Sequence, residues 1–486
     1  MSEHQHMEYE AVIGLEVHAQ LQTASKIFSP SSTAFGAPPN THVDPVCLGM
    51  PGVLPVLNRK AVEFAIRMGL ATHCRIAGRS IFARKHYFYP DLPKGYQISQ
   101  YELPLCEHGY VEIEPEQGEK RRIAIVRIHL EEDAGKSVHA EEYVAGDETL
   151  IDLNRCGVPL IEIVSAPDLR TPREAWLYLA KLRQLVRWLG ICDGNMEQGS
   201  LRCDANVSVR PVGEKKLGVK TELKNMNTLR GVEKALEYEI SRQIAAVRRG
   251  ETIVQETLLW DADRNVAVPM RSKEFAHDYR YFPDPDLVPL VVDDAWRDRI
   301  AAELPELPDS MRLRFTRQYG LPEYDAAILT EERELAAYFE SAAAEARDVK
   351  AVSNWIMGDV LRVIKEEKIS IAAFRVAPKA LAELVNLITE GVISGKIAKQ
   401  VFAEMLENGG TPKQIVEEKG LVQISDSSAI EQAVADALSA HPAEAERLRN
   451  GEGKLIGFFV GKVMQASRGK ANPKMVSELL QKQMRG

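Results

Sequence analysis

The densest group of reactive side chains in the sequence is the segment from His129 to Ser137, which reads HLEEDAGKS. Residues 121–130 alternate as a β-strand does, so that His129 and Glu131 share one face and Glu132 lies on the other. Loops at strand ends are where rigid scaffolds commonly hold ligand sites. We therefore expect this segment to form the centre of an active site.

Further acids lie on two other strand-like segments. An alternating segment near the N-terminus places Glu16 and His18 on one face, and Glu162 interrupts the apolar run LIEIV. If these groups meet Glu131 and Glu132, four carboxylates and one imidazole converge, and they would repel one another without a cation among them. Oxygen-rich ligation with a single histidine suits magnesium or manganese better than zinc. The pattern therefore predicts a magnesium site.

The alternative for each acid alone is a solvated position at a strand end. That alternative is favoured for any one acid considered by itself. It is disfavoured for Glu16 and Glu162, because both have apolar neighbours on either side and a carboxylate among apolar groups needs a partner.

The turn AGKS at residues 134–137 resembles the end of a phosphate-binding P-loop. A P-loop would need glycine where Leu130 stands, so this is not that motif. Lys136 and Ser137 beside a metal could still contact phosphate, and a plain turn is the equal alternative.

Two more groups of polar residues are candidates for substrate contacts. Arg84, Lys85 and Lys94 lie among tyrosines and phenylalanines, where cations hold anionic substrates and aromatic rings stack on nucleobases, although these rings also suit a core. Residues 200–206 alternate so that Arg202 belongs to a wholly polar strand face, which meets either solvent or a site.

Length and composition exclude several classes of protein. A chain of 486 residues is too long for one core and predicts two to four domains. The six cysteines are scattered without a C-x-x-C pair, which is typical of reduced thiols in a cytoplasmic protein. No stretch of about 18 uncharged apolar residues occurs, so we expect no membrane span.

The periodicity changes along the chain and predicts three domains of an α+β protein. Residues 1–295 mix strands with helices, among them residues 58–71, 171–189 and 227–248. Residues 296–407 show helical periods, with proline-bearing connections over 304–322, and residues 408–486 follow two glycines as a small all-α tail.

Cations gather at the end of the tail. Residues 451–486 hold seven Lys and Arg against two Glu, a local charge of +5 on a chain whose formal net charge is −9. A solvated helix surface is the alternative, but cations clustered around glycines suit contacts to the phosphates of RNA.

With these residues in view, the sequence closely resembles the B subunit of the bacterial three-subunit glutamyl/aspartyl-tRNA amidotransferase. The resemblance spans nearly the whole chain. Its motifs are residues 13–18, 51–55, 87–91, 96–100, 129–137, 159–164 and 199–206.

The resemblance implies a mixed α/β cradle domain with an antiparallel-rich sheet, a helical domain and a tail that binds tRNA. It implies ATP-dependent phosphorylation of the side-chain carboxylate of Glu-tRNA(Gln) or Asp-tRNA(Asn) in the cradle, with ammonia from the glutaminase subunit displacing the phosphate. It also implies a heterotrimer with the A (glutaminase) and C subunits. Asp44 stands where some relatives carry a cysteine of a zinc-binding pair, which disfavours a zinc site here without deciding whether zinc is bound.

The family's site carries over to this sequence residue by residue. The resemblance assigns Mg2+ ligation to Glu16, His18, Glu131, Glu132 and Glu162. We expect catalytic roles for Glu131, Glu132, Lys85 and Lys94, and contacts to ATP from Lys136, Ser137 and Arg202.

Two other classes of function remain open from the residues alone. A non-catalytic tRNA-binding scaffold would use the acids to order a domain around a structural metal. A metal-dependent phosphoesterase would release phosphate from a phosphodiester without glutamine or tRNA.

Overall fold

The structure is a computed structural model that describes residues 7–115, 120–139, 148–270, 279–422, 427–467 and 471–485. The chain forms two compact units, Met1–Leu307 and Pro308–Gly486. The first is built on a mixed sheet with helices and the second is helical, which confirms the α+β fold class.

The first unit is organised around a nine-stranded sheet. Its order is β14-β13-β12-β11-β1-β10-β7-β6-β2, and only the β12–β13 pair is parallel. The strands are β1 (Tyr9–Gln20), β2 (Arg75–Ile76), β6 (Cys106–Ile113), β7 (Arg121–Glu132), β10 (Pro159–Ser165), β11 (Leu201–Pro211), β12 (Thr221–Lys224), β13 (Thr257–Asp261) and β14 (Val266–Pro269).

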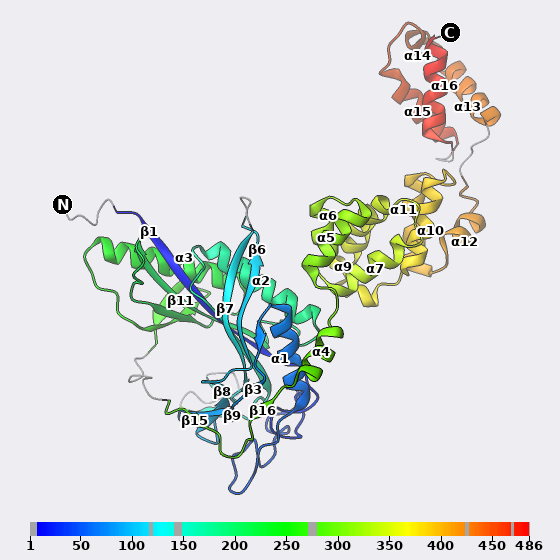
Figure 1. Ribbon diagram of the computed structural model, residues 1–486. Coiled ribbons are helices and arrows are strands. Elements are labelled where there is room, and N and C mark those ends of the chain that lie inside the picture. The colour runs from blue at the N-terminus through cyan, green and yellow to red at the C-terminus, as the bar shows by residue number, and fades with distance from the viewer. Residues whose placement is uncertain are drawn as a thin grey trace. The chain divides into compact units, whose positions relative to one another are not determined.

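Three helices pack on one face of this sheet, as Figure 1 shows. They are α1 (Arg59–Ala71), α2 (Pro172–Trp188) and α3 (Leu229–Arg248). A polar side chain before each helix accepts a backbone N–H of its first turn: Asn58 from Lys60, Thr171 from Glu174 and Thr228 from Gly231. Helix α3 thus begins two residues after the start that was expected at residue 227.

Strand alternation decides which side chains the helices cover. On β1 the residues Ile13, Leu15 and Val17 are buried in the core, while Glu16 and His18 lie on the opposite face. Glu16 and His18 therefore lie on the face of the sheet that carries no helix.

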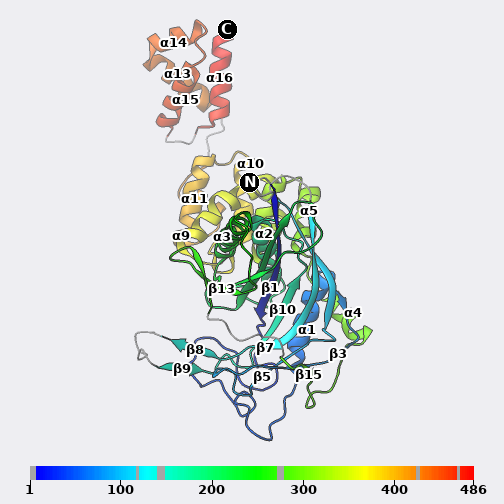
Figure 2. The same ribbon diagram turned by 90° about the vertical axis from the view of Figure 1, so that its left-hand side faces the viewer.

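Three small sheets complete the unit. They join β15 (Phe282–Pro283), β4 (Ala83–His86) and β5 (Tyr96–Ser99); β16 (Leu290–Val291) and β3 (Arg79–Ser80); and β8 (Lys136–His139) and β9 (Thr149–Asp152). Figure 2 shows them together at one end of the long strands, where β5 contacts β7.

The first unit extends beyond residue 295. Helix α4 (Asp294–Ala302) packs on α1, and its Ile300 belongs to the core of the sheet. The compact unit therefore ends at Leu307. Our three-part division stays a prediction.

The second unit contains helices in two hydrophobic groups. The first group is α5 (Pro308–Tyr319), α6 (Glu323–Leu329), α7 (Arg333–Ala343), α8 (Val349–Trp355), α9 (Leu361–Glu367), α10 (Pro378–Thr389), α11 (Gly395–Asn408) and α12 (Pro412–Glu418). The second group has its own core: α13 (Ser427–Ala440), α14 (Pro442–Arg449), α15 (Leu455–Ala466) and α16 (Pro473–Arg485).

One expectation about this unit was wrong. The segment 308–319 is a helix rather than a connection, because Pro308 occupies the helix start and Phe315 is fully buried. Helices α8 and α9 are joined without a break by a π-helical turn at Ile356–Val360.

Within the described ranges, every helix is too short or too polar to cross a membrane. All six cysteines are buried free thiols.

Candidate active site

Four strands carry one row of polar side chains across the open face of the sheet. In the antiparallel register His18 of β1 pairs with Arg202 of β11 and Glu162 of β10, and Glu162 pairs with His129 of β7. Directly opposed residues lie about 5 Å apart. The register therefore brings together side chains that are far apart in the sequence.

One carboxylate oxygen of Glu162 lies between two imidazoles. Its Oε2 is 3.5 Å from Nε2 of His18 and 3.3 Å from Nε2 of His129. The same nitrogen of His129 lies 3.2 Å from Oε1 of Glu131. Ligand atoms of His18, Glu131 and Glu162 all lie within 4.8 Å of one another. We call His18, Glu131, Glu162 and His129 the histidine–glutamate cluster.

The neighbouring strand β5 orients Glu131. Ser99 donates a hydrogen bond of 2.6 Å from Oγ to Oε1 of Glu131, and Gln97 donates one of 3.2 Å from Nε2 to Oε2. Both carboxylate oxygens are thus held from a second sheet. Nothing in the local sequence pattern of Gln97 or Ser99 predicts this role.

Burial and charge oppose each other in this cluster. Burial alone would lower the pKa of His129, but the carboxylates of Glu162 and Glu131 raise it to about 9. Burial would raise the pKa of Glu131 and Glu162, and their histidine contacts lower both instead. Nδ1 of His129 is buried without a hydrogen-bond partner in the described part of the chain.

A second acidic group lies beside the first on the same face. Glu16, Asp204 and Glu222 have carboxylate oxygens within 4.8 Å of one another. Lys224 contacts Asp204 at 2.5 Å and Glu222 at 3.0 Å. Burial, followed by the charges of Glu162, Glu222 and Asp204, raises the pKa of Glu16.

The four acids and one histidine expected in one site therefore occupy three places. His18, Glu131 and Glu162 meet, whereas Glu16 belongs to the second acidic group. Glu132 lies on the other side of β7, where it forms a buried ion pair with Lys94 and accepts a 2.8 Å hydrogen bond from the backbone N–H of Ile98. Lys94 and Glu132 thus fasten the segment before β5 to β7.

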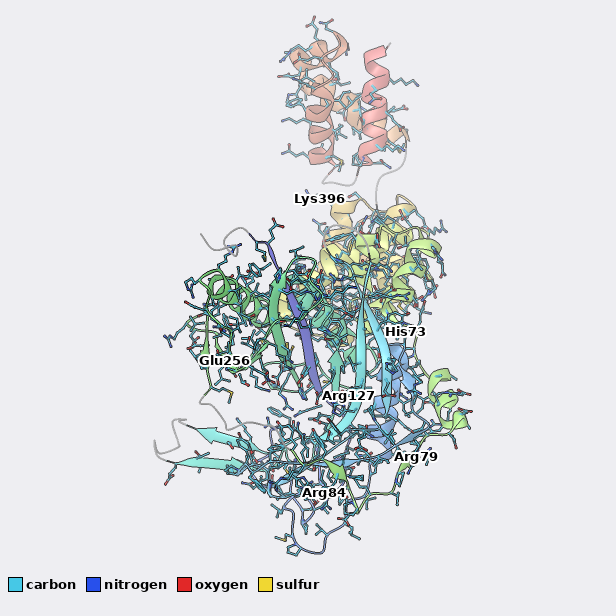
Figure 3. All side chains as sticks on the ribbon, turned by 60° about the vertical axis from the view of Figure 1, so that its left-hand side comes forward. His73, Arg79, Arg84, Arg127, Glu256 and Lys396 are labelled. Carbon is cyan, nitrogen blue, oxygen red and sulfur yellow. The ribbon has the colours of Figure 1, made fainter. Side chains whose placement is uncertain are left out.

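The two basic residues of β4 have different surroundings. Arg84, labelled in Figure 3, donates to Asp284 at 2.9 Å and to Asp286 at 2.7 Å, so it holds the strand β15 in place. Lys85 lies 4.8 Å from the ring centroid of Tyr279. Burial would lower the pKa of Lys85, but the charge of Glu131 raises it.

The turn at residues 133–137 does not form a phosphate loop. Its backbone N–H groups at Asp133 and Gly135 donate to the carbonyls of Val158 and Asp91, so neither is available to an anion. Gly135 is required, because a Cβ there would lie 2.9 Å from the Asp91 carbonyl oxygen. Ser137 donates to Asp91, and Lys136 is exposed.

Arg202 is fixed by a carboxylate that the sequence reasoning did not assign. Its two terminal nitrogens donate to Asp133 at 2.9 and 3.0 Å. Burial would raise the pKa of Asp133, but the charges of Arg202 and Arg155 lower it to about 2. Asp133 is the last of the three consecutive acids at residues 131–133, whereas no pattern in the sequence marks Arg155 as its partner.

Within the histidine–glutamate cluster, His18, Glu131 and Glu162 form a donor set that fits a divalent cation. The ligand atoms of His18, Glu131 and Glu162 lie within 4.8 Å of one another, whereas adjacent ligands of an octahedral Mg2+ at 2.0–2.1 Å lie about 2.9 Å apart, so a bound cation would draw these side chains closer together. Two carboxylates and one imidazole supply the charge and the hard donors that magnesium and manganese prefer.

Known proteins of one kind match the whole chain. Residues 11–298 match the GatB/GatE catalytic domain, and residues 337–484 match the GatB domain. The aspartyl/glutamyl-tRNA(Asn/Gln) amidotransferase B subunit of Thermodesulfovibrio yellowstonii is 60% identical over 474 residues, 98% of this chain and 99% of its own length. The proteins of that name from Chlorobium phaeobacteroides and Geobacter sulfurreducens are each 57% identical over 480 residues, covering 99% of this chain and 100% of their own.

Proposed function

The chain belongs to the family of B subunits of the aspartyl/glutamyl-tRNA(Asn/Gln) amidotransferases, and from this premise we propose how its first unit performs the reaction. The chain is part of a tRNA-dependent ligase of translation. In our proposal ATP phosphorylates the side-chain carboxylate of misacylated Glu-tRNA(Gln) or Asp-tRNA(Asn), and ammonia then displaces the phosphate. The observation that carries it is the histidine–glutamate cluster next to a second acidic group and two cations.

The reaction needs charge neutralisation rather than a protein nucleophile. A carboxylate is a poor acyl donor until it is phosphorylated, and phosphoryl transfer depends on positioning and electrostatic stabilisation. Burial raises the pKa of the thiols of Cys74, Cys106, Cys156, Cys192 and Cys203, which disfavours a reactive thiolate at each. Glutamine hydrolysis is therefore assigned to the separate glutaminase subunit.

One Mg2+ would be held by His18, Glu131 and Glu162. The second acidic group, Glu16, Asp204 and Glu222, would face a second cation or the phosphates that this second cation accompanies. When bound, Mg2+ supplies positive charge that offsets the phosphate oxygens. The Glu132–Lys94 ion pair keeps β5 against β7, and β5 in turn orients Glu131.

The cations near the cluster have separate roles in this proposal. Lys85 is a buried cation over the ring of Tyr279 whose pKa the charge of Glu131 raises, so we assign it to the anionic substrate carboxylate. Arg202 pairs in register with His18 and is fixed by Asp133, so we assign it to the phosphates of ATP. Lys136 and Ser137 are less favoured for ATP, because the turn around them binds Asp91.

We assign the tail to tRNA and the remaining subunits to the same assembly. Lys454, Lys474 and Lys482 are exposed on the described tail helices, as phosphate contacts require. The A (glutaminase) and C subunits would complete the heterotrimer, with ammonia delivered from the glutaminase. A component of translation that works with tRNA is placed in the cytoplasm.

One assay separates this proposal from the scaffold and phosphoesterase alternatives. ATP hydrolysis by the assembled amidotransferase is measured with and without Glu-tRNA(Gln), for wild type and Glu131→Ala. We expect tRNA-dependent hydrolysis in the wild type and a loss of at least about 100-fold in the variant. Full tRNA-dependent hydrolysis in Glu131→Ala would exclude the cluster as the catalytic site, and phosphodiester hydrolysis without tRNA would favour the phosphoesterase.

A further inference from the structure

Lys26 is a buried cation whose surroundings the candidate active site does not explain. The residue is 1% exposed. Its Nζ donates to the carbonyl oxygen of His42 at 2.6 Å and to that of Leu153 at 3.5 Å. It also donates to Sγ of Cys47 at 3.4 Å. A fully buried lysine is normally paired with a carboxylate. Among the described residues no carboxylate lies within ion-pair distance of this nitrogen, and its titratable partner there is the sulfur of Cys47.

Cys47 differs from the other cysteines in what its sulfur contacts. The Sγ atom accepts from Lys26 and lies 3.4 Å from Oγ of Ser29. Across the described ranges, the other five sulfurs contact backbone groups or, for Cys74, a threonine hydroxyl. A cationic neighbour is typical of cysteines that react with peroxide. Cys47 is therefore our candidate for oxidation.

Lys26 and Cys47 pack together against one stretch of backbone. A Cβ on Gly157 would lie 3.5 Å from Cδ of Lys26 and 3.8 Å from Sγ of Cys47. Cys47 belongs to the segment 33–58, which contains neither helix nor strand, and Pro45 beside it is exposed. Irregular surface segments open locally more readily than the strands of a core. A molecule as small as hydrogen peroxide can therefore reach this sulfur, which is 5% exposed.

We propose that Cys47 and Lys26 form an oxidative modification site, in which hydrogen peroxide links Sγ to Nζ through one oxygen atom. The observation that carries the proposal is the 3.4 Å contact between these two atoms, made without a carboxylate beside the amine among the described residues. One bridging oxygen spans most of this gap, whereas a direct sulfur–nitrogen bond would require a much closer approach. The inference does not rest on the proposed function.

The reaction consumes two molecules of peroxide. One transfers an oxygen atom to the thiol, which becomes a sulfenic acid, and leaves as water. Lys26 gives its ammonium proton to water, and the second peroxide transfers an oxygen atom to the free amine, which becomes a hydroxylamine. The hydroxylamine oxygen then bonds to sulfur, the sulfenic S–OH bond breaks, and that hydroxyl leaves as water with the hydroxylamine O–H proton. Sulfur and nitrogen together lose four electrons, and the two peroxides gain them.

Cys156 is the competing partner for an oxidised Cys47. Its Sγ donates to the backbone carbonyl oxygen of Cys47 at 3.5 Å. A sulfenic acid also condenses with a thiol, which would give a disulfide between the two cysteines. A disulfide removes two hydrogens and adds no oxygen, so the mass of the product distinguishes the two linkages.

The experiment is peptide mapping by mass spectrometry of the full-length chain in the assembled amidotransferase. The protein is treated with hydrogen peroxide and a chelator, so that no metal ion occupies the thiol, and is digested without reductant. We expect a linked pair of peptides that contain residues 26 and 47. The mass of this pair should equal the sum of the two peptides plus one oxygen and minus two hydrogens. Excess dithiothreitol should release both peptides.

Three variants locate the linked atoms. Lys26→Arg keeps a cation beside the sulfur but has no primary amine, and Cys47→Ser has no sulfur, so neither should form the pair. Cys156→Ser is the matched control, because it removes the neighbouring thiol and should retain the pair. Should Lys26→Arg unfold, fragmentation of the wild-type pair still identifies the linked residues.

The other products would overturn the proposal. A pair that joins residues 47 and 156 without added oxygen would assign the oxidation to a disulfide. Sulfinic acid at Cys47 with an unmodified Lys26 would show that the two side chains do not react. An unmodified Cys47 at a peroxide concentration that oxidises Met50, which is 50% exposed, would show that the oxidant does not reach the sulfur. Failure of the proposed function would appear elsewhere, as an absence of tRNA-dependent ATP cleavage.

Discussion

The charge of His129 should make the metal-free protein lose stability between neutral and alkaline pH. The folded-state pKa of His129 is about 9, against an ordinary value of about 6.5. A raised folded-state pKa adds stability that is complete below pH 6.5 and is lost as the pH rises through 9. At 1.36 kcal/mol for each pKa unit, the loss is about 3 kcal/mol.

Glu162→Gln tests the cause of this shift. Its Oε2 is 3.3 Å from Nε2 of His129, and its charge is the largest of the groups that raise the pKa of that imidazole. Removing the charge should bring the folded pKa closer to 6.5 and flatten the slope of stability against pH. Glu112→Gln, on the strand β6 and outside the cluster, should keep the wild-type slope.

The measurement is urea unfolding at several pH values from 6 to 9.5 with a chelator present to exclude divalent cations. Fluorescence of the buried Trp188 and Trp260 follows the first unit. The reasoning is refuted if wild type is equally stable across this range, or if Glu162→Gln loses stability as steeply as wild type does.

Three further predictions follow from other contacts. Lys94→Met leaves Glu132 as a buried unpaired charge and should lower the free energy of unfolding by about 3–5 kcal/mol. The double variant Lys94→Met with Glu132→Gln should recover part of this lost stability in the same urea titration. No recovery in the double variant would contradict the ion pair. The pKa of Asp133 is lowered to about 2, which adds stability above about pH 3.9 that is lost as the pH falls through 2. In Asp133→Asn the free energy of unfolding should therefore depend less steeply on pH in this range, as measured by acid unfolding followed by circular dichroism. An unchanged acid midpoint would count against the Arg202 contact. Truncation after Asn408 should weaken tRNA binding at physiological salt while the first unit unfolds as before; unchanged tRNA affinity would remove the tail from the binding surface.

Local pattern predicted a large part of the fold. The alternation of β1 identified a half-buried strand with Glu16 and His18 on its polar face, as the structure shows. Thr171 and Pro172, at the start of α2, predicted where this helix begins. The same logic failed at α5, because its apolar residues are few and its prolines suggested a connection.

Local pattern predicted less of the candidate site. It selected His18, Glu131 and Glu162, and the structure brings these three together. It grouped Glu16 with them, although Glu16 lies nearer to Asp204 and Glu222, which strand pairing supplies. The partners Gln97 and Ser99 come from a separate sheet and leave no trace near Glu131 in the sequence.

The sequence by itself determined which residues share a face, because side-chain direction in a strand follows from a period of two. It also determined the family, through motifs spread over nearly the whole chain. Only the tertiary structure decided which residues on that face meet. The pairing of β11, β1, β10 and β7 sets Arg202, His18, Glu162 and His129 in one row, and a shift of one residue in any pair would turn that strand's acids into the core.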